Sequence, residues 1–297
     1  MTNSFEGKQN TGRDRIAPNE RMHMHIEQLF DKGVGKINED AMTIGATRFG
    51  VFDGVSSRAG YVDEHGKSGG YLAANIAKEV FETFKGSLTQ TAMEANKRIE
   101  SVMEDKGIDI TKKENRWGTT MAVVDVNHSE KEFEWAQVAD SLVIVIYTDG
   151  TFKQLIQDDY DHDRGIMSLW KELADTKTED IRGKLDGNIR QLRQDVNVTF
   201  GVINGQADVS KFIRTGKESL ENVAHILIFT DGLLIPKEDP QANDDFSVTV
   251  NLFLEGGLPK VRDHIRATED TDPNCWKYPR YKKSDDIAAI AVSFQKS

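Results

Sequence analysis

The residues best placed to do chemistry are aspartates that stand at the ends of apolar runs. Asp53 and Asp231 each come after such a run and precede a glycine, whereas Asp285 stands shortly before a run that begins at Ile287. Uninterrupted apolar runs of this length are typical of strands that are buried on both faces. Carboxylates that converge at the ends of such strands repel one another unless a divalent cation binds between them. The pattern therefore predicts a metal site assembled from aspartates that are far apart in the sequence.

A competing interpretation is that Asp-Gly marks a β-hairpin, because it is a common two-residue turn. Asp149-Gly150 fits that interpretation, since runs of strand-forming residues stand on both sides of it. The residues after Asp53-Gly54 are instead small and polar and lead towards a helix, and no alternating strand resumes after Asp231-Gly232. We therefore expect a hairpin turn at Asp149 and functional carboxylates at Asp53 and Asp231.

The motifs, taken in order, resemble those of the metal-dependent protein phosphatases of the protein phosphatase 2C family, especially its bacterial members. The resemblance extends over nearly the whole chain, from about residue 24 to residue 294. No single motif is specific, but seven of them follow the order found in the family. They are Asn38-Glu39-Asp40-Ala41, Val51-Phe52-Asp53-Gly54, Trp117-Gly118-Thr119-Thr120, Ala139-Asp140-Ser141, Gly201-Val202-Ile203-Asn204-Gly205, Phe229-Thr230-Asp231-Gly232-Leu233 and Asp285-Asp286-Ile287.

The resemblance implies a centre of two divalent cations. Asp53 would bridge both ions through its carboxylate, and the carbonyl of Gly54 would bind one of them. Asp231 and Asp285 would hold the first ion, and Glu39 would hold the second, directly or through water. Oxygen ligands without His or Cys favour Mg²⁺ or Mn²⁺. In the family such a pair positions a bridging water that attacks phosphorus in line, with no phosphoenzyme.

Two more carboxylates belong to the implied metal set. Asp40 is a neighbour that supports the direct ligands, and Asp140 would help to bind a third, weaker cation, as in bacterial relatives. An alternative role for Asp140 is to cap the turn between two strands. Asp53 and Asp231, together with Lys36, are our candidate catalytic residues.

The sequence departs from the family pattern at two positions. Gly35 stands where the family has a phosphate-binding arginine, and Lys36, Lys32 or Arg58 could replace it, although lysine offers a point charge and no bidentate fork. Val55 stands where animal and plant members have a histidine that is the proposed general acid.

The elements that would position these residues form an α+β fold. Residues 1–20 are expected to be a polar tail, and residues 21–297 a single domain with a flap segment at about 158–197. Two amphipathic helices are predicted over 70–85 and 89–105, followed by an antiparallel meander over 118–156. The family resemblance sharpens this to a four-layer α-β-β-α sandwich with two central antiparallel sheets.

Composition excludes several classes of function. The net charge of −11 argues against a protein that binds the phosphate backbone of nucleic acid. A single cysteine, Cys275, allows no internal disulfide, and no apolar run approaches the length needed to span a membrane. We therefore expect a cytoplasmic, monomeric protein. The basic and aromatic stretch 276–283 is interpreted as a surface loop, with docking of a phosphorylated partner as the alternative.

These observations together predict a metal-dependent phosphatase that removes phosphate from phosphoserine and phosphothreonine in proteins. Its partner would be a phosphorylated protein, and it would act in opposition to a Ser/Thr kinase. Two alternatives stay open. One is a regulatory or binding module with a phosphatase fold and weak catalysis, which the missing arginine and histidine would permit. The other is a hydrolase of small phosphoesters.

Overall fold

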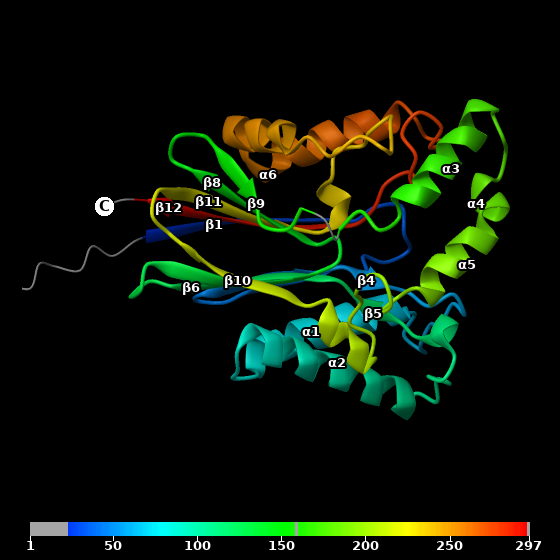
Figure 1. Cartoon of the computed structure of the whole chain (residues 1–297), viewed down its shortest axis with the longest axis horizontal. Helices are drawn as coiled ribbons and strands as arrows, with labels where there is room; N and C mark the ends of the chain where they lie inside the picture. Colours follow the sequence, from blue (N-terminus) through cyan, green and yellow to red (C-terminus); the bar gives the residue numbers. More distant parts are fainter. Residues whose placement is uncertain (1–22, 158–159, 296–297) are drawn as a thin grey trace, which may run out of the picture.

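The computed structural model describes residues 23–157 and 160–295. The expected polar tail at 1–20 lies outside the described residues, and so do Asp158 and Asp159 at the start of the expected flap. Within them, two five-stranded antiparallel sheets lie face to face, with helices covering both outer faces (Figure 1). This is the predicted four-layer α-β-β-α sandwich.

The first sheet has the order β1-β12-β11-β8-β9. It joins the two ends of the described chain, because β1 pairs antiparallel with β12 along its whole length. The hairpin between β8 and β9 turns at Asp149-Gly150, as the sequence predicts. The bounds of its strands are β1 His23–Asp31, β12 Ile287–Gln295, β11 Val223–Phe229, β8 Leu142–Tyr147 and β9 Phe152–Gln154.

The second sheet has the order β10-β7-β6-β3-β2, and a short ribbon of β4 and β5 lies beside it. The first strand of the predicted meander is in fact two strands, β5 and β6, that are separated at Thr120. The break occurs because the amide of Thr120 donates to the carbonyl of Asp53 instead of continuing one ladder. The bounds are β10 Arg214–Ser219, β7 Glu132–Val138, β6 Met121–Asn127, β3 Arg48–Phe52, β2 Ala41–Ile44, β4 Gly54–Val55 and β5 Gly118–Thr119.

Helices α1 (Gly69–Thr83) and α2 (Leu88–Asp105) cover the outer face of the second sheet. Their starts follow local capping rules, because the side chain of Ser68 accepts from the Tyr71 amide and Ser87 forms a capping box with Gln90. Helix α6 (Phe246–Asp270) covers the first sheet and was not predicted from the sequence.

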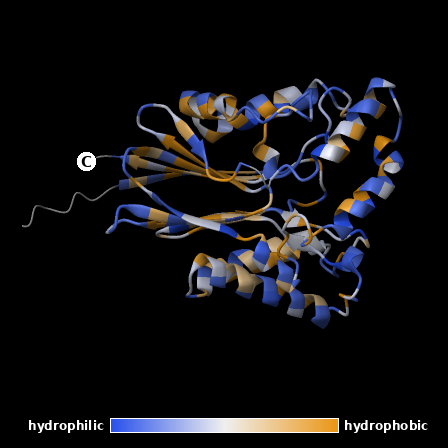
Figure 2. Ribbon diagram, viewed as in Figure 1, coloured by the Kyte–Doolittle hydropathy of each residue, from blue (hydrophilic) through white to orange (hydrophobic). Residues whose placement is uncertain are grey.

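The alternation of side chains along each strand creates separate apolar cores on its two faces. On β8, Leu142, Ile144 and Ile146 pack with the residues of α6, whereas Val143 and Val145 pack between the two sheets. Burying such a side chain contributes about 1.5–3 kcal/mol relative to leaving it exposed. Both faces of the strand therefore need apolar residues, which explains the uninterrupted apolar run. Figure 2 shows the same concentration of hydrophobic residues in the sheets.

The flap forms three short helices at one end of the sandwich (right in Figure 1). They are α3 (Arg164–Asp175), α4 (Ile181–Lys184) and α5 (Asp186–Gln194). Helices α4 and α5 meet at Leu185, which ends the first and precedes the second. A small apolar cluster joins the three helices to Cys275, Trp276 and Tyr281. Among the described residues, no helix has both the length and the apolar character needed to cross a membrane.

Candidate metal centre

A cavity of about 540 Å³ lies between the flap and the strand ends. Carboxylates from distant parts of the chain line it, together with four basic side chains. The carboxylates are Glu39, Asp53, Asp140, Asp163, Asp186, Asp231 and Asp285, and the basic residues are Arg58, Arg182, Arg193 and Lys282.

Asp53 is held in place through its backbone. It follows β3, and its carbonyl accepts hydrogen bonds from Thr119 Oγ1 at 2.8 Å and from the Thr120 amide at 3.0 Å. Gly54 comes next and pairs with Thr119 in the β4–β5 ribbon. A Cβ atom at Gly54 would lie 2.5 Å from the carbonyl oxygen of Glu39, so only glycine fits between this strand and its neighbours.

Ser56 orients the carboxylate of Glu39. The serine hydroxyl donates to Glu39 Oε1 at 2.7 Å and accepts from the Gly70 amide at 3.2 Å. The start of α1 is thereby connected to the cavity through one serine side chain. Ser56 is therefore a positioning residue for Glu39.

Asp40 points into the protein interior and is only 2% exposed. Its carboxylate accepts a hydrogen bond of 2.7 Å from the hydroxyl of Thr230, and that hydroxyl accepts from the Ala288 amide at 2.9 Å. Asp40 does not line the cavity, and its role as a support for the ligands stays a prediction. Thr230 immediately precedes Asp231, so this contact fixes the strand end that carries Asp231.

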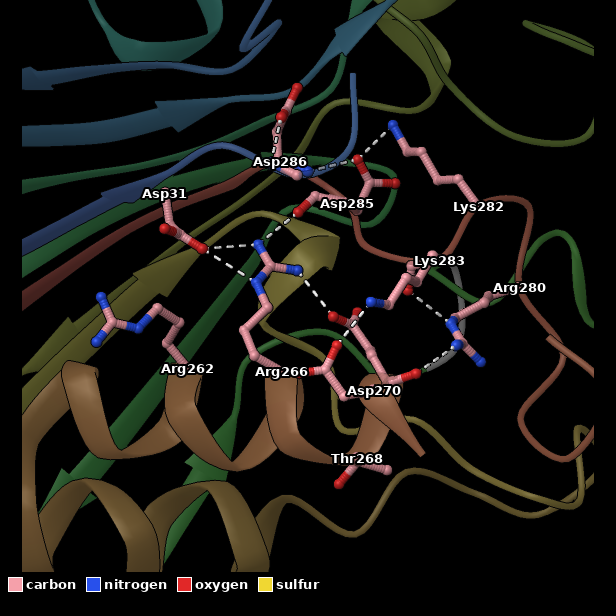
Figure 3. A network of polar contacts seen from close by, with 12 residues as sticks. Asp31, Arg262, Arg266, Thr268, Asp270, Arg280, Lys282, Lys283, Asp285 and Asp286 are labelled. Atoms are coloured by element: carbon pink, nitrogen blue, oxygen red, sulfur yellow. Dashed lines mark hydrogen bonds and ion pairs between the residues drawn. The ribbon is translucent and has the colours of Figure 1, made fainter. Parts of the chain in front are cut away.

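Two contacts fix the segment that carries Asp285. The carboxylate of Asp286 accepts from the amides of Gly33 and Glu39, both at 2.8 Å. Arg266 on α6 donates to the carbonyl of Asp285 at 2.7 Å and to the carboxylate of Asp31 at 2.9 Å (Figure 3). Asp286 is thus bonded to the backbone between β1 and β2, and Arg266 ties this segment to the helix.

Asp140 reaches the cavity from the turn between β7 and β8. One of its carboxylate oxygens, Oδ1, is buried and has no hydrogen-bond partner among the described residues. The other oxygen lies 3.8 Å from Nε2 of His162. The His162 ring stacks on Phe200, with ring centroids 4.0 Å apart.

The carboxylates raise one another's pKa values. Burial raises the pKa of Asp53 well above its usual range, and the charge of Asp231 raises it further. Burial and the charge of Asp285 raise the pKa of Asp231 in the same way. Burial also raises the pKa of Asp40, although its hydrogen bond from Thr230 acts in the opposite direction. Concentrated negative charge of this kind is what a bound cation relieves.

The basic residues near the cavity differ in how they are placed. Lys282 Nζ forms an ion pair of 2.5 Å with Asp285 Oδ1. Arg58 pairs with Asp186 at the cavity wall. Lys36 and Lys32 are exposed and do not line the cavity, and Lys32 donates to the Gly35 carbonyl. The phosphate-binding role suggested for Lys36 therefore stays a prediction, with no contact in the structure to support it.

The donor set fits a hard divalent cation. Glu39, Asp53, Asp231 and Asp285 offer oxygen atoms from four separate segments to one cavity, and Asp140 offers a buried oxygen without a partner. Among residues 23–157 and 160–295, no group of three or more His, Cys, Asp or Glu side chains is already arranged to hold a metal ion. Lys282 pairs with one carboxylate oxygen of Asp285 in this arrangement.

A family model for protein phosphatase 2C matches residues 33–260, which is well over half of the 297-residue chain. The chain belongs to the protein phosphatase 2C family. The resemblance seen in the sequence motifs is thereby confirmed. No curated protein matches the sequence.

Solved bacterial structures share the fold of this protein phosphatase 2C chain at low identity. The catalytic domain of the serine threonine protein phosphatase PstP, in complex with two manganese ions, has a TM-score of 0.55 and 14% identity over 92% of this chain and 99% of that one. Stp1 from Staphylococcus aureus has a TM-score of 0.54 and 17% identity over 98% and 100%. RsbX in complex with magnesium has a TM-score of 0.50 and 13% identity over 94% and 98%. These similarities establish the fold.

Sequence reasoning missed several of the residues that line the cavity. His162, Arg193 and Lys282 lie outside every motif that identifies the family. His162 and Arg193 reach the cavity only because the flap folds over it, and Lys282 does so because the segment before Asp285 turns back. The sequence shows many charged residues in the flap segment. It does not show which of their side chains face the cavity.

Proposed function

We propose that this member of the family is a phosphatase that depends on Mn²⁺ or Mg²⁺ and hydrolyses phosphoserine and phosphothreonine in proteins. The observation that supports it most is the convergence of Glu39, Asp53, Asp231 and Asp285 on one cavity. A decayed site would not be expected to keep all four carboxylates and the contacts that orient them. The activity would be carried by a single domain over residues 21–297, with its flap at about 158–197.

Each proposed ligand has a role in this account. The cations would be contacted by the carboxylate of Asp53 and the carbonyl of Gly54. Asp231 and Asp285 would hold one ion, and Glu39 would hold the other. Asp140 would hold a third, weaker ion, and Asp40 would support Asp231 through Thr230. Two bound ions would supply an activated water and offset the charge of the phosphoryl group.

The surrounding residues would prepare the site before substrate arrives. Ser56 holds Glu39 in one orientation, and Arg266 fixes the backbone at Asp285. Hydrogen bonds from Thr119 and Thr120 fix the backbone at Asp53. Groups held in this way do not have to reorganise during the reaction. Such preorganisation of polar groups stabilises the transition state.

The proposed substrate class rests on the family and on the solved neighbours, several of which are serine/threonine phosphatases by name. A phosphorylated protein would be the partner, with a Ser/Thr kinase as the opposing enzyme. We further propose a monomer that acts in the cytoplasm. A regulatory module with weak catalysis is the second candidate, because Gly35 and Val55 stand where other members have an arginine and a histidine.

The proposal is tested by replacing Asp53 with asparagine. Hydrolysis of p-nitrophenyl phosphate in Mn²⁺ should fall by at least about a hundredfold, because one weakened bridging ligand loosens both ions at once. Chelation should abolish the activity of the unmodified protein. Asp149→Asn is the matched control, since Asp149 also precedes a glycine but lies in the β8–β9 turn. Turnover in Asp53→Asn equal to that of the unmodified protein would rule out the proposed centre.

A further inference from the structure

Arg193 is a charged residue in the cavity wall that has no hydrogen-bonded or ion-paired partner among the described residues. It stands near the end of α5 and lines the cavity beside the metal-site carboxylates. Within residues 23–157 and 160–295 the structure gives it no hydrogen bond and no ion pair. The other guanidinium groups of the cavity are engaged, because Arg58 pairs with Asp186 and Arg182 donates to the Tyr281 carbonyl.

An unpartnered arginine in such a place is unfavourable for folding. Its side chain is partly buried, and burial lowers the pKa of the guanidinium, although the charges of Tyr281 and Asp53 act in the opposite direction. The group nevertheless stays charged, because arginine does not lose its proton in proteins. Burying a charge without a hydrogen-bonded partner costs stability. A role in binding an anion would explain why this position holds an arginine.

The backbone that carries Arg193 is firmly mounted. Lys113 Nζ donates to the Gln194 carbonyl at 2.7 Å and to the Val196 carbonyl at 3.0 Å, which ties the end of α5 to the main body. Leu192 and Val55 pack against the apolar cluster that includes Val196. Val55 is the residue that stands in place of the family histidine. Its apolar side chain packs against the segment that follows α5.

This chain lacks an arginine at the position where the family has its phosphate-binding arginine. Gly35 occupies that position, and the nearby Lys32 and Lys36 are exposed and do not line the cavity. A phosphoryl dianion in a cavity lined by carboxylates needs a donor on the protein in addition to the cations. Arg193 offers a planar fork with five N–H donors, which suits the oxygens of a phosphate.

We propose that Arg193, delivered by the flap, binds the phosphoryl group of the substrate and the inorganic phosphate product. This inference rests on the proposed function, because it assigns the anion contact of the same site. It also carries a consequence for stability. A residue kept for binding and not for folding should be replaceable by an apolar residue without loss of stability, since that removes an unpaired charge.

Calorimetric titration of the Mn²⁺-loaded protein with inorganic phosphate tests the inference. Arg193→Met should weaken phosphate binding by roughly 10- to 100-fold, the range expected for a hydrogen-bonded charge. Arg193→Lys should fall between Arg193→Met and the unmodified protein, because it keeps the charge but loses the fork. Arg190→Gln is the control, since Arg190 lies on the same helix, is exposed and pairs with Asp186. The melting temperature of the Mn²⁺-loaded Arg193→Met protein should be equal to or above that of the Mn²⁺-loaded unmodified protein, because the cations then neutralise the carboxylates that Arg193 faces.

Three results would overturn the inference. One is a phosphate affinity that stays within about twofold of the unmodified protein in both Arg193→Met and Arg193→Lys. Loss of a hydrogen bond to a charged group should change the affinity by more than that. Another is an equal loss in Arg190→Gln. The third is a loss of affinity that comes with weaker Mn²⁺ binding and a lower melting temperature, which would assign Arg193 a structural role. If Arg193→Met does not fold, Arg193→Lys and Arg193→Gln decide by the same measurement. Because phosphate binding is measured without turnover, it decides on Arg193 even if the unmodified protein hydrolyses no phosphoester.

Discussion

Ala139 adopts a backbone conformation that favours glycine. Its φ is 58°, and it directly precedes Asp140 at the cavity. The family motif at this position has glycine, which reaches positive φ without the steric cost that a Cβ atom introduces. The chain therefore accepts local strain beside one of its proposed metal ligands.

Ala139→Gly should stabilise the protein by up to about 1 kcal/mol, because release of the strain exceeds the extra entropy of the unfolded chain. Urea unfolding of the metal-free protein measures the difference. Ala136→Gly on β7 is the control and should be destabilising, since that alanine is fully buried within a strand. A loss of stability in Ala139→Gly comparable to that of the control would contradict this account of the turn.

At the level of single residues, the sequence was most informative where the chemistry resides in short motifs. Asp53, Asp231 and Asp285 follow from their places at strand ends and Glu39 from its place in a family motif, and the structure brings all four to one cavity. Arg193 could not be found in this way. Its place depends on how the flap folds over the strand ends, and no local pattern encodes that contact.

At the level of elements, α6 shows why a long helix was missed. Gly256, Gly257 and Pro259 interrupt its sequence pattern, and Gly257 has a φ of 71° that breaks the helix into two parts. The second part begins at a cap supplied by another element. Glu27 on β1 accepts a hydrogen bond of 2.9 Å from the Leu258 amide. Such a cap between distant segments cannot be seen from the residues next to the helix.

Glu27→Ala should destabilise the protein by roughly 0.5–2 kcal/mol, the range for loss of a helix cap. Glu27→Gln should cost less, because an amide oxygen still accepts from Leu258. Chemical unfolding of the two variants measures this order, and Glu255→Ala, which removes an exposed carboxylate of α6, is the control. Equal stability of Glu27→Ala and the unmodified protein would show that the cap contributes nothing.

The stretch 276–283 is a loop, as the sequence predicts, and its aromatic residues are partly buried. Trp276 and Tyr281 pack against the apolar cluster of the flap helices. Arg280 forms an ion pair of 2.9 Å with Asp272 and donates to the Lys283 carbonyl. The aromatic and basic residues thus connect the end of α6 to the flap, and composition alone does not distinguish that role from docking.

At the level of the whole molecule, the apolar runs predict buried strands, and the family resemblance implies that these strands form two sheets. The strand ends then bring the carboxylates together, and their charges make the metal-free fold sensitive to pH. The folded-state pKa values of Asp53 and Asp231 are raised above their unfolded values. Their contribution to stability is therefore present below the unfolded pKa of about 4 and is lost as the pH rises through the raised folded values.

In the presence of chelator, Asp53→Asn should therefore gain stability relative to the unmodified protein as the pH rises. The amide mimics the protonated carboxyl, so its advantage in the free energy of unfolding should be larger at pH 8 than at pH 5.5. Urea unfolding at the two pH values measures the difference. Saturating Mn²⁺ should reverse the order at pH 8, because only the unmodified protein keeps the full ligand set. An advantage that is the same at both pH values would contradict the raised pKa of Asp53.

The central claim is that the carboxylate cavity hydrolyses phosphoprotein substrates with the help of divalent cations. The most direct measurement is the release of inorganic phosphate from a phosphothreonine peptide in Mn²⁺, in Mg²⁺ and with chelator, compared with a small phosphoester such as glycerol phosphate. We predict release that requires the metal and a kcat/KM for the peptide well above that for the small ester. Binding of the peptide without release of phosphate at saturating Mn²⁺ would contradict the claim and favour a regulatory module.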